Sequence, residues 1–124
     1  MLVARFEMDE EKRSAVLRLQ GHAQAGKAGQ DIICAGASMM AYELAQCLKV
    51  MRERGLLRYE PVCKMREGNT LISCKAKESG WAETLVHFLH TQTGFYLLAH
   101  HYPSFVAVEM LGNDEEEEEE DVQS

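Results

Sequence analysis

Residues 37–55 read ASMMAYELAQCLKVMRERG and carry a clear helical pattern. Apolar side chains recur at spacings of three and four residues, which places them on one stripe of an α-helix. This predicted stripe consists of Ala37, Met40, Ala41, Leu44, Leu48 and Met51. Basic residues in the last turn suit the negative end of the helix dipole, and Gly55 predicts where the helix ends.

Shorter segments of extended character flank this helix on both sides. The segments predicted as strands are residues 3–8, 16–20, 59–63, 70–77 and 105–108, with turns expected at residues 9–12 and 67–69. A second helix is expected from Ser79-Gly80 to just before Pro103, and Gly94 weakens it by ~1 kcal/mol relative to Ala, so that it could split there. Its apolar face is expected to contain Trp81, Leu85, Phe88, Leu89 and Tyr96. The order ββαββαβ predicts an α+β fold, a small mixed or antiparallel sheet with two main helices on one face.

The net charge of −7 over 124 residues comes from one end of the chain. Residues 114–121 are eight consecutive acids out of 20 Asp and Glu, which leaves 12 against 13 Lys and Arg elsewhere. We therefore predict one nearly neutral domain over residues 1–112. Residues 113–124 are expected to form a disordered acidic tail.

Several classes of protein are excluded by the pattern. No apolar run approaches the roughly 18–20 residues that cross a bilayer, and the N-terminus has no signal-peptide pattern. We therefore expect a cytoplasmic protein without membrane contact. Aromatic residues do not alternate with a basic patch and no glycine-rich phosphate loop is present, so direct nucleic-acid or nucleotide binding is not expected.

The cysteines and histidines do not form a recognisable metal-binding pattern. The four cysteines, Cys34, Cys47, Cys63 and Cys74, include no C-x-x-C pair and are expected to be reduced thiols. His87 and His90 lie three residues apart on the second predicted helix, but no cysteine set with matching spacing accompanies them. We expect neither a metal nor another cofactor.

One group of residues suggests chemistry. A predicted strand brings His22 to the edge of a glycine-rich segment, residues 21–30, which is expected to be a mobile loop. The chain is then expected to enter the first helix at or just after Cys34. Free N–H groups and the positive dipole end of a first helical turn would favour a Cys34 thiolate and could bind an oxyanion. The His22 imidazole beside this sulfur would complete a thiolate–imidazolium pair.

Each of these residues also has a structural interpretation. Cys34 among apolar neighbours can be a small buried core residue, in which case the domain would be a non-catalytic binding module. Asp31 suits a helix cap better than it suits a role in orienting His22. Ser38 lies one helical turn after Cys34, where it either supports the site or makes a local backbone bond. A redox thiol protein is a further alternative that would need a second, resolving cysteine.

The motif Gly21-His22-Ala23, then a glycine-containing loop, then Asp31-Ile32-Ile33-Cys34-Ala35-Gly36-Ala37-Ser38 resembles a known family. The bacterial ribosomal-processing cysteine protease family, Prp, has the pattern G-H-A, a glycine-containing loop and D-[IV]-[IV]-C-A-x-x-S. The resemblance extends to the element order from residue 1 to about residue 110. It departs at Gly36, where a larger small residue is common, and in the acidic tail.

The resemblance implies both a reaction and a set of roles. Cys34 would be the nucleophile and His22 the general base, with Gly21, Asp31, Ala35 and Ser38 as the supporting motif. The substrate would be the N-terminal peptide of large-subunit ribosomal protein number twenty-seven, cut after an aromatic residue that precedes a small one. The family implies a homodimer whose loop orders over the substrate. The alternative is a non-catalytic dimeric peptide-binding or ribosome-assembly module with Cys34 as a core residue.

Overall fold

The computed structural model describes residues 1–23 and 27–111, without the side chains of residues 27–31. The elements are β1 (Leu2–Asp9), β2 (Ser14–Gln20), α1 (Lys27–Glu53), β3 (Val62–Arg66), β4 (Asn69–Lys75), the short 3₁₀-helix η1 (Glu78–Gly80), α2 (Trp81–His101) and β5 (Val106–Leu111). This order confirms the predicted ββαββαβ arrangement.

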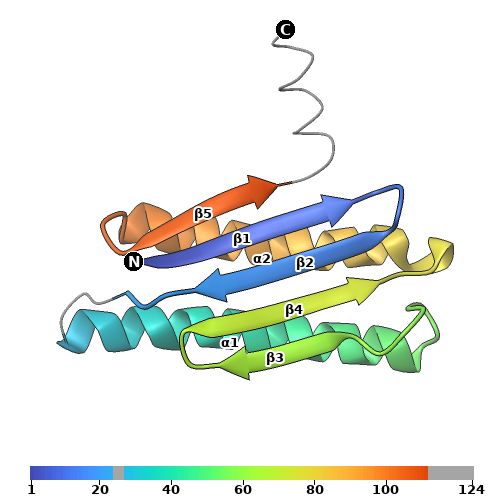
Figure 1. Cartoon of the computed structure of the whole chain (residues 1–124), viewed down its shortest axis with the longest axis horizontal. Helices are drawn as coiled ribbons and strands as arrows, with labels where there is room; N and C mark the ends of the chain where they lie inside the picture. The colour runs from blue at the N-terminus through green and yellow to red at the C-terminus, as the bar shows by residue number, and fades with distance from the viewer. Residues whose placement is uncertain (24–26, 112–124) are drawn as a thin grey trace, which may run out of the picture.

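The five strands form one mixed sheet in the order β3-β4-β2-β1-β5. The pair β1–β5 is parallel, and the other three pairs are antiparallel. Both helices lie on the same side of the sheet, α1 behind β3 and β4 and α2 behind β1, β2 and β5 (Figure 1). The fold is therefore the predicted two-layer α+β arrangement.

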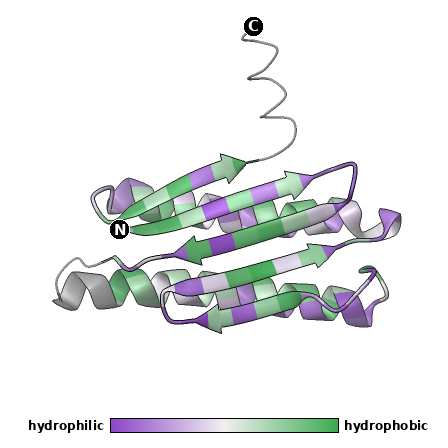
Figure 2. Ribbon diagram, viewed as in Figure 1, coloured by the Kyte–Doolittle hydropathy of each residue, from purple (hydrophilic) through white to green (hydrophobic). Residues whose placement is uncertain are grey.

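Alternating strand residues meet the apolar stripes of the helices to form the core. Leu2, Ala4 and Phe6 of β1 are buried, and the Phe6 ring packs edge-on against Phe95 of α2 at 6.0 Å between centroids. Figure 2 shows runs of apolar residues, in green, along the strands, interrupted by polar residues in purple. On the open face of the sheet, Arg5 pairs with Glu109 at 2.6 Å across the parallel strands. The opposite face therefore supplies the core, as period-two alternation requires.

The prediction of the first helix is right in its apolar stripe and wrong in its start. The helix begins at Lys27, so residues 27–30 are helical and not part of a loop. Ile33 is fully buried and extends the stripe one turn before Ala37. Packing of this extra turn against the core stabilises helical structure in a segment whose glycine content disfavours it.

The second helix is continuous through Gly94, so this glycine does not split it. Its buried residues are Trp81, Thr84, Phe88, Gln92 and Phe95, whereas Leu89 and Tyr96 are exposed. Two of these buried residues, Thr84 and Gln92, are polar, so the stripe could not be recognised from apolar spacing alone. The Thr84 hydroxyl donates to the Gly80 carbonyl at 2.8 Å, and Gln92 Nε2 donates to Met110 Sδ at 3.2 Å.

The predicted strand ends differ from the observed ones by a few residues. β3 begins at Val62 and not at residue 59, and β5 ends at Leu111 and not at residue 108. Pro61 precedes β3 and has no N–H to donate to a sheet. Gly112 and the predicted acidic tail, residues 113–124, lie outside the described residues.

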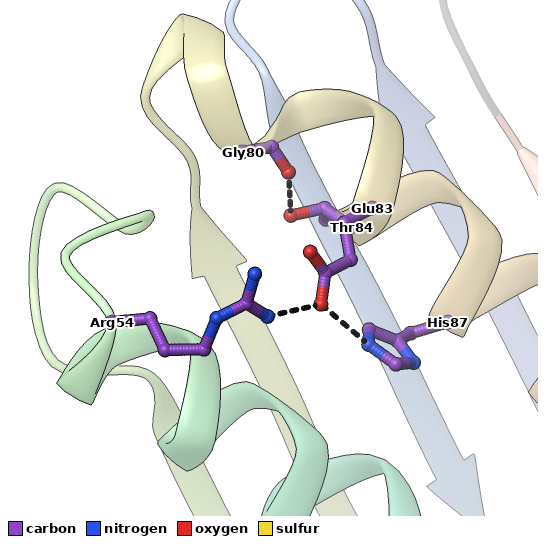
Figure 3. A network of polar contacts seen from close by, with 5 residues as sticks. All are labelled: Arg54, Gly80, Glu83, Thr84 and His87. Carbon is purple, nitrogen blue, oxygen red and sulfur yellow. Dashed lines mark hydrogen bonds and ion pairs between the residues drawn. The ribbon is translucent and has the colours of Figure 1, made fainter.

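A polar junction joins the end of α1 to the start of α2 (Figure 3). Arg54, just after α1, donates to Glu83 at 2.7 Å, and Glu83 lies 3.5 Å from His87 Nε2. The hydrogen bond from Arg54 holds the pKa of Glu83 below its usual value, and His87 acts in the same direction. Because the pair is exposed, it orients the helix ends more than it stabilises the fold.

Neither helix within residues 1–23 and 27–111 is long and apolar enough to span a bilayer.

Two glycine substitutions should change stability in opposite directions. A Cβ at Gly80 would overlap the Leu56 carbonyl oxygen, whereas one at Gly36 would lie 3.9 Å from Leu98 Cδ1, an ordinary contact. Gly80→Ala should therefore lower the free energy of unfolding by about 1–3 kcal/mol. Gly36→Ala should raise it by ~0.5–1 kcal/mol through helix propensity. Urea denaturation measures both, and equal effects would contradict the packing described at Gly80.

Candidate active site

Three chain segments meet at one end of the sheet, at the left in Figure 1. They are the end of β2, the first turns of α1 and the turn between β3 and β4. The antiparallel pairing of β2 with β4 sets Gln20 opposite Asn69. Beyond this pair, the Gly21 N–H donates to the Gly68 carbonyl at 3.0 Å. This bond fixes the exit of β2 against the hairpin turn.

A cavity of about 280 Å³ opens where these segments meet. Four of the site residues predicted from the sequence line it: Gly21, His22, Cys34 and Ser38. The structure thus brings the imidazole and the thiol to one cavity, although they are separated by a segment that includes residues 24–26, outside the described chain. Ala35 is exposed and does not line the cavity, and the Asp31 side chain is not described.

The His22 imidazole rests on the hairpin turn. A Cβ built on Gly68 would lie 2.9 Å from His22 Nε2, closer than real Cβ contacts, and 3.3 Å from Cε1, a tight contact. Gly68 also has a φ of 77°, a conformation that glycine adopts at little cost. The turn therefore needs glycine at this position for two separate reasons, and one of them is the space that the ring occupies.

Cys34 lies seven residues after Lys27, about two turns into α1. The prediction that it begins the helix is therefore wrong. The N–H groups of residues 34–36 lie within the hydrogen-bonded part of the helix, since only the first four N–H groups of a helix lack an intrahelical acceptor. They cannot serve as the free oxyanion donors that were predicted from the sequence.

Other polar groups line the cavity in their place. Ser38 lies one turn after Cys34 on the same face of α1, and Asn69 is the first residue of β4. The Ser38 hydroxyl is a neutral donor of the kind that stabilises a developing oxyanion, whereas Asn69 pairs with Gln20 and its side chain lies on the open face of the sheet. Within the described residues, His22 and Cys34 make no hydrogen bond to each other, and such bonds often tighten only when substrate binds.

Sequence reasoning missed the contribution of the hairpin. Residues 66–70 line the cavity together with Leu2 and Leu19, yet the sequence identified residues 67–69 only as a turn. The missing information was the pairing of β4 with β2. These two strands are neighbours in the sheet, but the whole of α1 lies between them in the sequence. A turn signal alone does not specify which distant segment lies beside it.

The other three thiols are poorer candidates for a nucleophile because burial raises each of their pKa values. The Cys74 thiol has its pKa raised to about 12 and is only 7% exposed. Burial also raises the pKa of Cys47, where Glu43 and Glu83 act in the same direction. The pKa of Cys63 is raised by burial as well, partly opposed by the positive charge of Lys49. A thiolate, the reactive form, is disfavoured at all three positions.

Residues 1–23 and 27–111 contain no group of three or more His, Cys, Asp or Glu side chains arranged to hold a metal ion.

Comparisons with known proteins point to one family. A family model described as cysteine protease Prp matches residues 1–107. Crystal structures with the same fold include SMU.848 from Streptococcus mutans, 21% identical with a TM-score of 0.66 over 91% of this chain and 96% of that one. The essential ribosomal processing protease Prp from S. aureus, in complex with a covalently linked product peptide, is 17% identical, with a TM-score of 0.65 over 90% and 100%. The same protease with a substrate peptide is 16% identical, with a TM-score of 0.64 over 90% and 100%.

No match was found among curated protein sequences.

Gly68→Ala should disturb His22 more than it disturbs the fold. The added methyl would displace the imidazole, so we expect altered His22 ring signals in NMR spectra and a change of about tenfold or more in any His22-dependent reaction rate of Cys34. Alkylation of Cys34, followed by mass spectrometry, measures that rate.

Gly55→Ala is the matched control for Gly68→Ala. Gly55 has a φ of 78°, and a Cβ added there would have nothing within 4 Å. Both variants should therefore lose similar stability from backbone strain, and only Gly68→Ala should alter His22. Identical His22 signals in the two variants would contradict the contact.

Proposed function

The chain belongs to the cysteine protease Prp family, and on that premise we propose that Cys34 is the nucleophile and His22 the general base of an endopeptidase. The observation that carries the proposal is the shared cavity, since His22 and Cys34 line it together. The other thiols support the assignment by exclusion. Cys47, Cys63 and Cys74 lie outside this cavity, and burial raises their pKa values.

The proposed reaction divides peptide hydrolysis into two steps. The Cys34 thiol gives its proton to His22, and the sulfur attacks the scissile carbonyl carbon. Ser38 donates a hydrogen bond to the resulting oxyanion. His22 returns the proton to the leaving amine as the C–N bond breaks, which leaves a thioester. A water molecule then attacks the thioester while His22 takes its proton, and the acid product and the free thiol are released.

The substrate that we propose is the N-terminal extension of large-subunit ribosomal protein number twenty-seven. Family membership supports this, as does the likeness in fold to a ribosomal processing protease that has been observed with a substrate peptide. A ribosomal-protein substrate would put the activity in the cytoplasm. An extended N-terminal peptide can enter an open cavity without unfolding the rest of the substrate.

We also propose that the protein forms a homodimer. Large apolar side chains on the outer face of α2 support this, since Leu89, Tyr96 and Leu97 are 44%, 49% and 56% exposed. A row of exposed apolar residues on one helix is typical of an interface. Sedimentation of the purified chain tests the association directly.

Cys34→Ala should abolish cleavage. The experiment incubates the purified protein with a peptide that copies the first residues of the same cell's ribosomal protein, and mass spectrometry locates any cut. We expect a single cut with the native chain and a loss of at least about 10³-fold in kcat for Cys34→Ala and for His22→Ala. Cys47→Ala, on the same helix, is the matched control and should retain activity. Full activity in Cys34→Ala would reject the proposal.

Thiol labelling separates the protease from a non-catalytic module in which Cys34 is a core residue. In the protease, iodoacetamide should modify Cys34 first, and His22→Ala should slow that reaction. Cys74 should remain unmodified until the protein unfolds, because its pKa of about 12 and its burial both suppress the thiolate. Slow modification of Cys34 that does not depend on His22 would favour the binding module.

A further inference from the structure

A second concave surface lies beside the candidate active site, between α1 and the edge strand β3. Its volume is about 610 Å³, and Met39 and Tyr42 of α1 face Cys63 and Met65 of β3 across it, with Lys49 at one end. Met39 and Tyr42 are 65% and 56% exposed, which is high for large apolar side chains. In Figure 1 the helix runs behind this strand along its length. We call this surface the α1–β3 groove.

The groove continues the active-site cavity along the same two elements. On α1, Cys34 and Ser38 line the cavity, and Met39 and Tyr42 line the groove. On the strand side, Arg66 lines the cavity and Met65 the groove. Tyr42 follows Cys34 by eight residues, or about 12 Å along a helix axis. An extended peptide covers that distance in about four residues.

The strand wall of the groove offers free backbone groups. Among the described strands β3 pairs only with β4, at the edge of the sheet. The turn between β3 and β4 has two residues, so Arg66 and Asn69 form a hydrogen-bonded pair across the hairpin. Hydrogen-bonded pairs alternate along two antiparallel strands, so Lys64 also bonds β4, whereas Cys63 and Met65 do not. The N–H and C=O groups of Cys63 and Met65 therefore point away from the sheet. Their side chains point toward α1, into the groove.

We propose that the α1–β3 groove binds the substrate peptide as an added β-strand and takes an apolar side chain three to five residues from the scissile bond. This inference rests on the proposed protease function. It adds a binding site for the part of the substrate peptide that lies away from the scissile bond. Edge strands beside an apolar groove bind extended peptides in this way: backbone hydrogen bonds supply affinity, and alternate side chains supply specificity. Tyr42 and the flexible Met39 and Met65 form a wall that adapts to apolar side chains.

Tyr42→Ala tests the groove, and Tyr59→Ala is the matched control. Tyr59 is 60% exposed, and it does not line the groove. Each variant is assayed on a long peptide with six residues on both sides of the cut and on a short peptide with two. Tyr42→Ala should raise KM for the long peptide about tenfold with little change in kcat, and leave the short peptide unaffected. Tyr59→Ala should match the native chain on both, and equal behaviour of the two variants would overturn the proposal.

Met65→Ala and Met65→Pro separate the side chain from the backbone. Both remove the thioether, but only proline removes the outward N–H, a change that an edge strand tolerates. We expect Met65→Pro to bind the long peptide several-fold more weakly than Met65→Ala does. Circular dichroism verifies that both variants fold. Equal affinities would exclude strand pairing at Met65.

A binding assay keeps the groove testable if no peptide is cut. Fluorescence anisotropy of the labelled long peptide with the Cys34→Ala protein reports affinity without any reaction. Binding that weakens about tenfold in Cys34→Ala/Tyr42→Ala and not in Cys34→Ala/Tyr59→Ala would support the groove even where the protease function fails. Affinities that are unchanged by Tyr42→Ala would reject the groove whether or not cleavage occurs.

Discussion

The antiparallel pairing of β2 with β4 is the constraint on which the candidate site depends. These strands come from opposite sides of α1 in the chain, and their register sets Gln20 opposite Asn69. Gly21, the residue after β2, donates its N–H to the Gly68 carbonyl at 3.0 Å, and the His22 ring packs on Gly68. A shift of one residue in this register would turn every side chain of the strand to the other face. The position of the imidazole is therefore a consequence of how the middle of the sheet is paired.

The apolar stripe of α1 imposes the second constraint. Ile33, Ala37, Ala41 and Leu44 are buried against the sheet, which fixes the rotation of the helix about its axis. This rotation turns Cys34 and Ser38 to the cavity and leaves Met39 and Tyr42 along the flank beside β3. One packing interaction thus determines both the direction of the thiol and the wall of the α1–β3 groove.

The positions of helices and strands could be predicted from local sequence patterns, whereas the pairing of distant strands could not. The stripe from Ala37 to Met51 was readable because its spacing is set by the helix itself, and glycines and turns separated the strands correctly. The start of α1 was missed because tertiary packing of Ile33 outweighs the low helix propensity of its neighbours. The cavity residues near Gly68 were missed because a turn motif carries no record of the strand beside it. His22 and Cys34 could be selected because both belong to one short motif, whereas Asn69 belongs to none.

The early start of α1 changes what can activate the thiol. Free N–H groups at a helix start would stabilise a thiolate by themselves, but Cys34 lies about two turns inside the helix, where the dipole has a weaker effect. In the proposed protease, activation would then depend on His22, and the position of His22 depends on the β3–β4 turn. The same hairpin supplies the edge strand of the α1–β3 groove. A peptide that pairs with β3 would therefore restrain the turn on which the imidazole rests, so that binding remote from the scissile bond improves the alignment of the reacting groups.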